Sequence, residues 1–457
     1  MSNRDSGYKP TPRKRVNAKD ASRGRSATAP DTSRRRSAAD PRARSAASAD
    51  RSRGRQTASP RERVSVERTA SPRAASSTID RKWLFLIGGA VVIAVLIVAL
   101  AFAFGGKRDE PKAADVQAGQ SEQAAASYKN SGPYSVSFTT TGDLIFWREV
   151  ADYIDANGGA SAMANIADML SQSDVTISNL ESPLSDNDSE PVYDKDVYII
   201  GRPSAIESVV NSGIDIVSLA NNHIMDYTGP ALQDTLNALD DKGILHAGAG
   251  MNEADADKIV ETTVNGASIA FFSWTDIVPD YYVAYGNEPG VASARLNMDD
   301  ALKRVREAKE THDIVIVAMH WGIEYQDFYD ESLQRNPAHQ LVDAGADVVL
   351  GNHPHVLQGI EFYNGSLIAY AHGNCVFRQA FEFGNTHESY VLNFDITEDG
   401  VKNVVATPLY LSDEYGIPSV ATGDQAQTTL SRLVEISEGL NTAFDVRDGK
   451  AYISPIA

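Results

Sequence analysis

Cysteine is almost absent from this 457-residue sequence, which contains only Cys375. No disulfide can therefore form within the chain, although this does not exclude a location outside the cytoplasm. Aromatic and branched apolar residues are nearly missing from residues 1–82, where Arg, Ser, Ala and Pro predominate. A segment of that composition buries too little apolar surface to offset the entropy lost on ordering, so we expect residues 1–82 to be disordered.

Acidic residues are scarce in the first part of the chain and abundant in the rest. Residues 1–82 hold 22 basic and 8 acidic side chains, a net charge of +14, whereas residues 83–457 hold 20 basic and 53 acidic ones, a net charge of −33. The change of sign falls at one hydrophobic segment. We interpret the two parts as lying in different compartments, which excludes a single soluble globule of uniform composition.

Charged residues are missing altogether from residues 83–104, WLFLIGGAVVIAVLIVALAFAF. As a helix rising about 1.5 Å per residue, this segment is long enough to cross a hydrocarbon core of roughly 30 Å. Arg81 and Lys82 precede it, so the positive-inside rule predicts a single-pass protein of the cell membrane with a cytoplasmic N-terminus and an extracellular C-terminal domain. A cleaved signal peptide is the alternative, with Ala-Phe-Ala around Phe102 as its cleavage site, but both the apolar segment and the region before it are too long.

Two low-complexity segments flank the predicted span. The sequence TASPR occurs at 57–61 and again at 69–73. It fits a phosphorylatable or nucleic-acid-binding arm, but we interpret it as part of a solvated tail attracted to anionic lipid headgroups. Residues 105–132 are small and polar without periodicity, which predicts a stalk that carries a folded domain at 133–457.

From residue 134 onward, short apolar runs rich in β-branched residues alternate with segments of helical length. This pattern predicts an α/β fold whose strands are buried on both faces. Polar residues of the kinds that bind metals recur just after the apolar runs: Asp143, Glu181, Asn222 with His223, His320, and His353 with His355. Each is weak evidence alone, because a His after a strand commonly packs or caps. Since loops beyond the strand carboxyl ends converge in α/β sheets, together they predict a divalent-metal site.

These motifs resemble those of the CapA family, the poly-γ-glutamate capsule biosynthesis proteins, which share the calcineurin-like metallophosphoesterase fold. The resemblance covers about residues 134–415 and leaves the tail and the span outside. Its motifs are Gly142-Asp143, Asn179-Leu180-Glu181, Leu219-Ala-Asn-Asn-His223 with Asp226, His320-Trp-Gly322 with Glu324, Gly345-Ala-Asp347, Gly351-x-His353-Pro-His355 and Tyr370-Ala-His-Gly-Asn374.

The resemblance implies a four-layer α/β/β/α sandwich with a dinuclear site at one edge, holding one or two divalent ions (Mn, Fe, Zn or Mg). Asp143 and His355 would bind the first metal, and Glu181 stands at the bridging position. Asn222, His320 and His353 would complete the second metal. The resemblance also implies that His223, oriented by Asp226, protonates the leaving group.

The sequence departs from the wider superfamily at the first motif. Ile145 stands where the superfamily has the His of Asp-x-His, so the first metal loses a neutral ligand and the metal count stays open. His372 replaces a Leu of the family motif; it could add a ligand, but we expect it to line the mouth of the site.

Two classes of function fit these observations. In the first, the chain is a membrane-anchored metal-dependent hydrolase that acts in poly-γ-glutamate capsule biosynthesis or export, with a polyglutamate synthase membrane complex as partner and an anionic polymer as substrate. In the second, a degenerate metal site only binds anionic polymer; a surface phosphoesterase unrelated to capsule is a further alternative. The near-complete ligand set and the pair His223 and Asp226 favour an enzyme. Because the basic tail and the site are predicted on opposite sides of the membrane, no nucleic-acid partner is expected.

Overall fold

The computed structural model describes residues 129, 132–189, 191–192, 195–379 and 385–456. The tail predicted at 1–82, the span predicted at 83–104 and nearly all of the stalk predicted at 105–132 lie outside these residues. Within the described ranges, no helix combines the length and apolar character that a membrane crossing requires.

The larger of two principal sheets has ten strands in the order β17-β18-β15-β14-β1-β2-β3-β4, with β13 beside β1 and β16 beside β15. Its strands are β1 (Ser135–Leu144), β2 (Val175–Leu180), β3 (Ile216–Ser218), β4 (Leu245–Ala247), β13 (Asn374–Val376), β14 (Glu388–Thr397), β15 (Gly400–Leu411), β16 (Pro418–Val420), β17 (Thr442–Arg447) and β18 (Lys450–Pro455). The run from β1 to β4 is parallel, as expected for strands joined by helices.

The second sheet has six strands in the order β11-β12-β10-β9-β7-β6, of which β7, β9, β10 and β12 are parallel. Its strands are β6 (Val260–Val264), β7 (Ala267–Thr275), β9 (Ile314–His320), β10 (Val348–Asn352), β11 (Ile360–Tyr363) and β12 (Ser366–Ala369). A separate two-stranded sheet pairs β5 (Ala249–Gly250) with β8 (Gly290–Val291).

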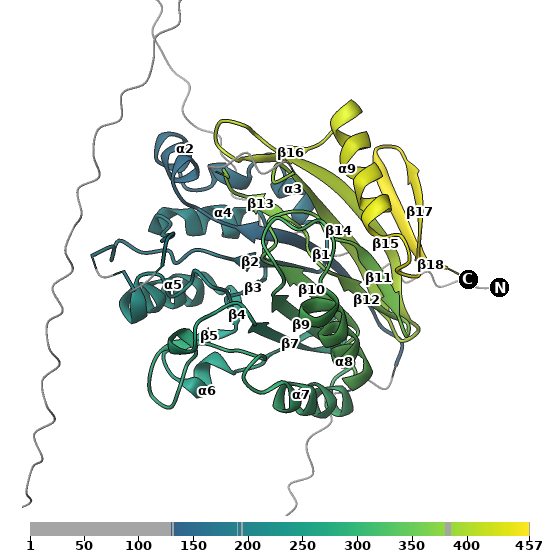
Figure 1. The fold of residues 1–457 in the computed structure, drawn as a ribbon, viewed down its shortest axis with the longest axis horizontal. Coiled ribbons are helices and arrows are strands. Elements are labelled where there is room, and N and C mark those ends of the chain that lie inside the picture. The colour runs from purple at the N-terminus through teal and green to yellow at the C-terminus, as the bar shows by residue number, and fades with distance from the viewer. Residues whose placement is uncertain (1–128, 130–131, 190, 193–194, 380–384, 457) are drawn as a thin grey trace, which may run out of the picture. The chain divides into compact units, whose positions relative to one another are not determined.

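The α-helices of the described residues lie mainly in the connections between strands (Figure 1). They are α2 (Glu149–Asn157), α3 (Ala167–Leu170), α4 (Ile206–Asn211), α5 (Thr228–Lys242), α6 (Glu253–Ala256), α7 (Met298–Thr311), α8 (Asn336–Ala344) and α9 (Gly423–Ile436). Short helical turns are η1 (Ser161–Met163), η2 (Pro203–Ala205), η3 (Asp280–Tyr282) and η4 (Glu331–Arg335), the last of them a π-helix.

The two principal sheets share one apolar core and each buries its other face under helices. On β9, Ile314 and Ile316 face the core between the sheets, whereas Val315 and Val317 pack in the core that includes α7 and α8. This division follows from the alternation of side chains along a strand. The outer face of the larger sheet packs against α2, α3, α4 and α5. The layers therefore run helix, sheet, sheet, helix, and the predicted α/β fold is confirmed.

The parallel strands bring their carboxyl ends to one edge of each sheet. Asp143 pairs in register with Asn179 of β2 and with Asn374 of β13, and His320 pairs with Asn352 of β10. The backbones approach closely here: a Cβ on Gly142 would lie 1.8 Å from the carbonyl oxygen of Gly373. Only glycine fits before Asp143, and this fixes where its carboxylate lies.

Candidate metal centre

Five of the six predicted metal ligands lie together at this edge. Ligand atoms of Glu181, His320 and His353 lie within 4.8 Å of one another, and so do those of Asp143, Glu181 and His355. Glu181 belongs to both groups, which corresponds to the bridging position implied for it. The sixth, Asn222, follows β3 and its Oδ1 lies 2.8 Å from Nε2 of His320.

Burial of Glu181 is costly because no hydrogen bond from the described residues offsets it. Its side chain is fully buried, and neither carboxylate oxygen has a hydrogen-bond partner among the described residues. The closest opposing group is Nε2 of His320, at 3.4 Å from Oε1. Burial, reinforced by the negative charge of Asp143, raises the pKa of the Glu181 carboxyl well above its usual value. Since an unpaired buried carboxylate is unfavourable, these oxygens fit a bound cation.

Asp143 is held from three sides. Nδ2 of Asn179 donates to Oδ1 at 2.8 Å, and the backbone N–H of His353 and Nδ1 of His355 each lie 3.4 Å from Oδ2. Burial alone would raise the pKa of Asp143, but the hydrogen bond and charge of His355 outweigh it and lower that pKa. The ionised form is the one that binds a metal.

At His355, too, burial and nearby charges have opposite effects on the pKa, and the charges prevail. Burial alone would lower its pKa, but the negative charges of Glu181 and Asp143 raise it to about 9. The ring is oriented by Asn374, whose Oδ1 lies 2.9 Å from Nδ1. A proton on His355 thus balances the carboxylates, and a metal cation between Asp143 and Glu181 would replace that positive charge.

His320 and His353 are kept neutral by their surroundings. Burial lowers the pKa of His320 to about 3, although the charge of Asp143 opposes it. Burial, with the charges of His320 and His355, lowers the pKa of His353 well below its usual value. Nδ1 of His353 is buried and has no hydrogen-bond partner in the part of the chain that the structure describes. Neutral imidazoles with an available nitrogen are suited to metal binding.

The turn that carries His353 and His355 is strained. Both residues have positive φ angles, 100° and 59°, which are unfavourable for side chains with a Cβ. Such conformations persist only where the surrounding structure enforces them, and they are common at functional sites. Here they direct two imidazoles from one turn toward the carboxylates.

His223 and Asp226, the predicted catalytic pair, are in direct contact. Nδ1 of His223 lies 2.6 Å from Oδ2 of Asp226, which also accepts from the backbone N–H of Ile199 at 2.7 Å. Burial lowers the pKa of His223 to about 4, and the nearby charge of Lys195 contributes. At neutral pH the isolated ring is therefore uncharged, whereas the role implied for it requires a protonated ring.

Lys195 and Tyr282 also contact Asp226, and neither was predicted from the sequence. Nζ of Lys195 donates to Oδ1 of Asp226 and to the backbone carbonyl of Asn222, and it lies 3.0 Å from Nδ1 of His223. The hydroxyl of Tyr282 donates to Oδ1 of Asp226 at 3.2 Å. Lys195 comes from a loop and Tyr282 from the helical turn η3, so no strand-end pattern in the sequence marks them.

His372 does not line the mouth of the site, so that prediction is wrong. Its side chain is fully buried, with Nε2 2.9 Å from Oγ1 of Thr140 and Nδ1 3.3 Å from the carbonyl oxygen of Gly351. Because Thr140 is in β1 and Gly351 is in β10, the ring joins the two sheets beneath the candidate metal centre. Both nitrogens are engaged, so His372 adds no ligand.

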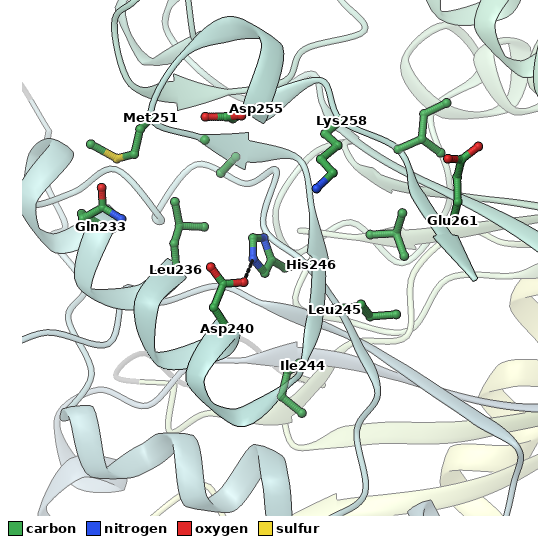
Figure 2. A pocket seen from close by; sticks show the side chains of 14 residues that line it. Gln233, Leu236, Asp240, Ile244, Leu245, His246, Met251, Asp255, Lys258 and Glu261 are labelled. Carbon is green, nitrogen blue, oxygen red and sulfur yellow. Dashed lines mark hydrogen bonds and ion pairs between the residues drawn. The ribbon is translucent and has the colours of Figure 1, made fainter. Parts of the chain in front are cut away.

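A separate pocket of about 480 Å³ lies between α5, β4, α6 and β6 (Figure 2). Nε2 of His246 lies 3.1 Å from Oδ1 of Asp240 there, and Figure 2 shows Lys258 above this pair. None of its lining residues is a predicted site residue. The pocket is therefore distinct from the candidate metal centre.

Comparison with known proteins identifies similar sequences. Residues 137–379 match the family described as "Bacterial capsule synthesis protein PGA_cap". The "PGA biosynthesis protein CapA" of Bacillus subtilis (strain 168) is 30% identical over 357 residues, covering 78% of this chain and 88% of that protein. The "Capsule biosynthesis protein CapA" of Bacillus anthracis is 29% identical over 340 residues, covering 73% of this chain and 81% of that protein.

Similarity to solved structures is much weaker. A 5'-nucleotidase precursor from Thermus thermophilus superposes with a TM-score of 0.34 at 12% sequence identity, covering 66% of this chain and 58% of that chain. Similarity of this size establishes neither the fold nor the activity of the chain.

Proposed function

This chain belongs to the family of bacterial capsule synthesis proteins, and we propose that it acts in poly-γ-glutamate capsule biosynthesis or export through a divalent-metal hydrolase site. The names of its relatives support the capsule role. One observation carries the chemistry: the buried carboxylate of Glu181, without a hydrogen-bond donor among the described residues, lies among imidazole groups and Asp143.

The residues present fit a pair of divalent cations. Asp143, Glu181 and His355 would hold one ion, and Glu181, His320 and His353 the other, with Asn222 beside His320. When bound, such cations polarise a substrate oxygen and lower the pKa of water. The helix, sheet, sheet, helix layers and the position of the site at the strand ends support assignment to the calcineurin-like metallophosphoesterase fold.

Proton transfer is assigned to His223. Asp226 engages Nδ1 and fixes the orientation of the ring, which leaves Nε2 to exchange a proton with substrate. The ring is neutral at rest because burial lowers its pKa to about 4, so it first acts as an acceptor. An anionic group arriving beside it would raise that pKa and allow the same nitrogen to donate to the leaving group.

The location and partners belong to the same proposal. A span at 83–104 would anchor the protein in the cell membrane, with the basic tail in the cytoplasm and the domain from 133 onward outside. The charge of +14 before the span and −33 from residue 83 onward supports this division. A polyglutamate synthase membrane complex would be the partner and an anionic polymer the substrate, without nucleic acid.

A non-catalytic polymer-binding role is the second candidate. Ile145, two residues after Asp143, is fully buried in a small apolar cluster with Ile199 and Phe377 and supplies no ligand. A centre that lacks this ligand could retain metal and bind an anionic polymer without turning it over.

Activity of the purified full chain loaded with Mn²⁺ separates these roles. The substrates are a γ-glutamyl amide and a phosphomonoester, and the variants are His223→Ala and, as a matched control, His246→Ala from the separate pocket. We expect γ-glutamyl amide hydrolysis that His223→Ala abolishes and His246→Ala preserves. Hydrolysis of the phosphoester alone would indicate a surface phosphoesterase, and metal binding without turnover of either would indicate the binding role.

A further inference from the structure

We propose that Glu324 is a further metal ligand, which completes the candidate centre from its solvent-facing side. Its carboxylate and ring nitrogens of His353 and His355 all lie within 4.8 Å of one another. Unlike the other carboxylates at the centre, Glu324 is exposed. The inference rests on the proposed function and concerns the composition of its metal site.

The buried residues alone leave the first ion short of ligands. Asp143, Glu181 and His355 form a group of three, whereas divalent cations in proteins take at least four ligands. Ile145 has a purely aliphatic side chain packed against Ile199 and Phe377, so the end of β1 contributes only Asp143. A carboxylate from another loop is therefore the kind of group that this centre requires.

Two buried groups point to a ligand independently of Glu324. Nδ1 of His353 has no hydrogen-bond partner among the described residues, and the side chain is only 3% exposed. Both carboxylate oxygens of Glu181, which is 0% exposed, also lack a hydrogen-bond partner among the described residues. Unpartnered polar atoms at this depth are unfavourable unless something binds them.

The loop after β9 is built to hold Glu324 at this place. Gly322 turns the chain with a φ of 86°, where a Cβ would meet Cδ of Gln334 at 2.6 Å. Tyr325 follows with a φ of 63°, which is strained for an aromatic residue. Its backbone N–H donates to the carbonyl oxygen of Pro354 at 2.8 Å, and its hydroxyl accepts from Nε2 of Gln379 at 2.8 Å.

These contacts tie the loop to the turn that carries the two histidines. Pro354 lies between His353 and His355, so the bond from Tyr325 fixes Glu324 relative to both imidazoles. The ring of Tyr325 also lies 6.1 Å from the ring of His355, centroid to centroid. The strained backbone of Tyr325 thus accompanies a defined position for Glu324.

Besides the amide of Asn222, the ligand set that results has three carboxylates and three imidazoles: Asp143, Glu181, Glu324, His320, His353 and His355. Three negative charges offset most of the charge of two divalent ions. Oxygen-rich sites favour Mn²⁺ and Mg²⁺ relative to sites dominated by nitrogen and sulfur. We therefore expect the site with Glu324 to prefer Mn²⁺ over Zn²⁺ more strongly than the same site with His at position 324.

Calorimetric titration of the metal-free full chain with Mn²⁺, with electron paramagnetic resonance of the bound ions, tests this inference. The variants are Glu324→Gln, Glu324→His and, as a matched control, Glu331→Gln. Glu331 is an exposed acid seven residues further on that pairs with Arg335 at 3.6 Å. We expect Glu324→Gln to weaken binding of one Mn²⁺ ion by about 10- to 100-fold or more, the loss typical of disturbing a metal's ligand shells.

Glu324→His should restore that ion with a preference shifted toward Zn²⁺, and Glu331→Gln should bind as the wild type does. If the wild type binds Mn²⁺ and Glu324→Gln binds it with equal affinity and stoichiometry, the inference is wrong while the proposed function stands. If the wild type binds neither Mn²⁺ nor Zn²⁺, both are wrong.

Discussion

Replacing His372 with Leu should make the protein's stability less sensitive to acid. The ring joins the two sheets beneath the candidate metal centre through Thr140 and Gly351. Burial lowers its pKa from 6.5 to about 4, so the folded protein keeps it neutral where the unfolded chain already protonates it. Because the unfolded state then binds more protons, stability falls as the pH drops from 6.5 toward 4.

The size of the effect follows from the shift. One pKa unit corresponds to about 1.4 kcal/mol, so the shift to about 4 corresponds to roughly 3 kcal/mol in full. At about pH 5 roughly 2 kcal/mol of that is already lost. His372→Leu removes this acid-induced loss of stability. It also leaves the buried hydroxyl of Thr140 without its hydrogen-bond partner, which should lower the unfolding free energy by about 1–3 kcal/mol at about pH 8. The unfolding free energy of the wild type minus that of the variant should therefore fall by roughly 2 kcal/mol from about pH 8 to about pH 5.

Urea denaturation of chelator-treated full chains, followed by tryptophan fluorescence, measures this difference. Trp147, Trp274 and Trp321 are described residues and report on the folded part. The other buried histidines titrate in both proteins, so their contributions cancel. A difference that is the same at both pH values, or larger in acid, would refute the reasoning that the fold holds His372 neutral.

Two further predictions concern the proposed catalytic pair, His223 and Asp226, and the proposed membrane topology. The cation of Lys195 contacts Asp226 and helps to lower the pKa of His223. Lys195→Met removes this cation, so we expect the protein to lose about 3 kcal/mol of unfolding free energy, measured by thermal unfolding. The pKa of His223 should rise, which shifts the acid limb of the pH–rate profile to higher pH, and the metal content should stay unchanged. An unshifted acid limb would contradict the assignment of His223. Protease added to intact cells should remove residues beyond 105 and spare an epitope in the basic tail; loss of the tail epitope instead would reverse the predicted orientation.

Much of the candidate site could be predicted because its residues directly follow apolar runs. Glu181 and His320 lie at or just after the last apolar residue of a strand, and Asp143 is the second-last residue of β1. Parallel pairing places Asp143 and Glu181 at one edge of the larger sheet, and packing of the two sheets places His320 of the second sheet beside them. The same argument predicts the position of His353, because β10 pairs with β9 in parallel. Periodicity and strand ends were informative for these residues because each of the two sheets carries its strand ends to the same edge of the molecule.

The remaining parts depend on contacts that sequence spacing does not encode. Lys195 contacts Asp226 from a loop 31 residues away, and Tyr282 contacts it from the helical turn η3, 56 residues away. His372 also follows a strand, as a ligand would, yet its ring is directed between β1 and β10. Which way a loop side chain is directed depends on tertiary packing, and only the structure supplies that.

The fold, like the site, could be predicted from the sequence only in part. Alternation on β9 between residues facing the two cores predicts a strand buried on both faces, as observed. The sequence did not predict that β13 would add beside β1 or that β17 and β18 would extend the larger sheet at its far edge. The pairings of β13 with β1 and of β18 with β15 join segments distant in sequence, so local pattern does not specify them.

The metal content of the full chain tests the central claim most directly. Elemental analysis of the wild type, of the double variant His353→Ala/His355→Ala and of the control His246→Ala should find one or two divalent ions per chain in the first and third, and none in the second. Equal metal content in all three proteins, or no metal in the wild type after loading with Mn²⁺, Fe²⁺, Zn²⁺ or Mg²⁺, would contradict a metal centre at the strand ends.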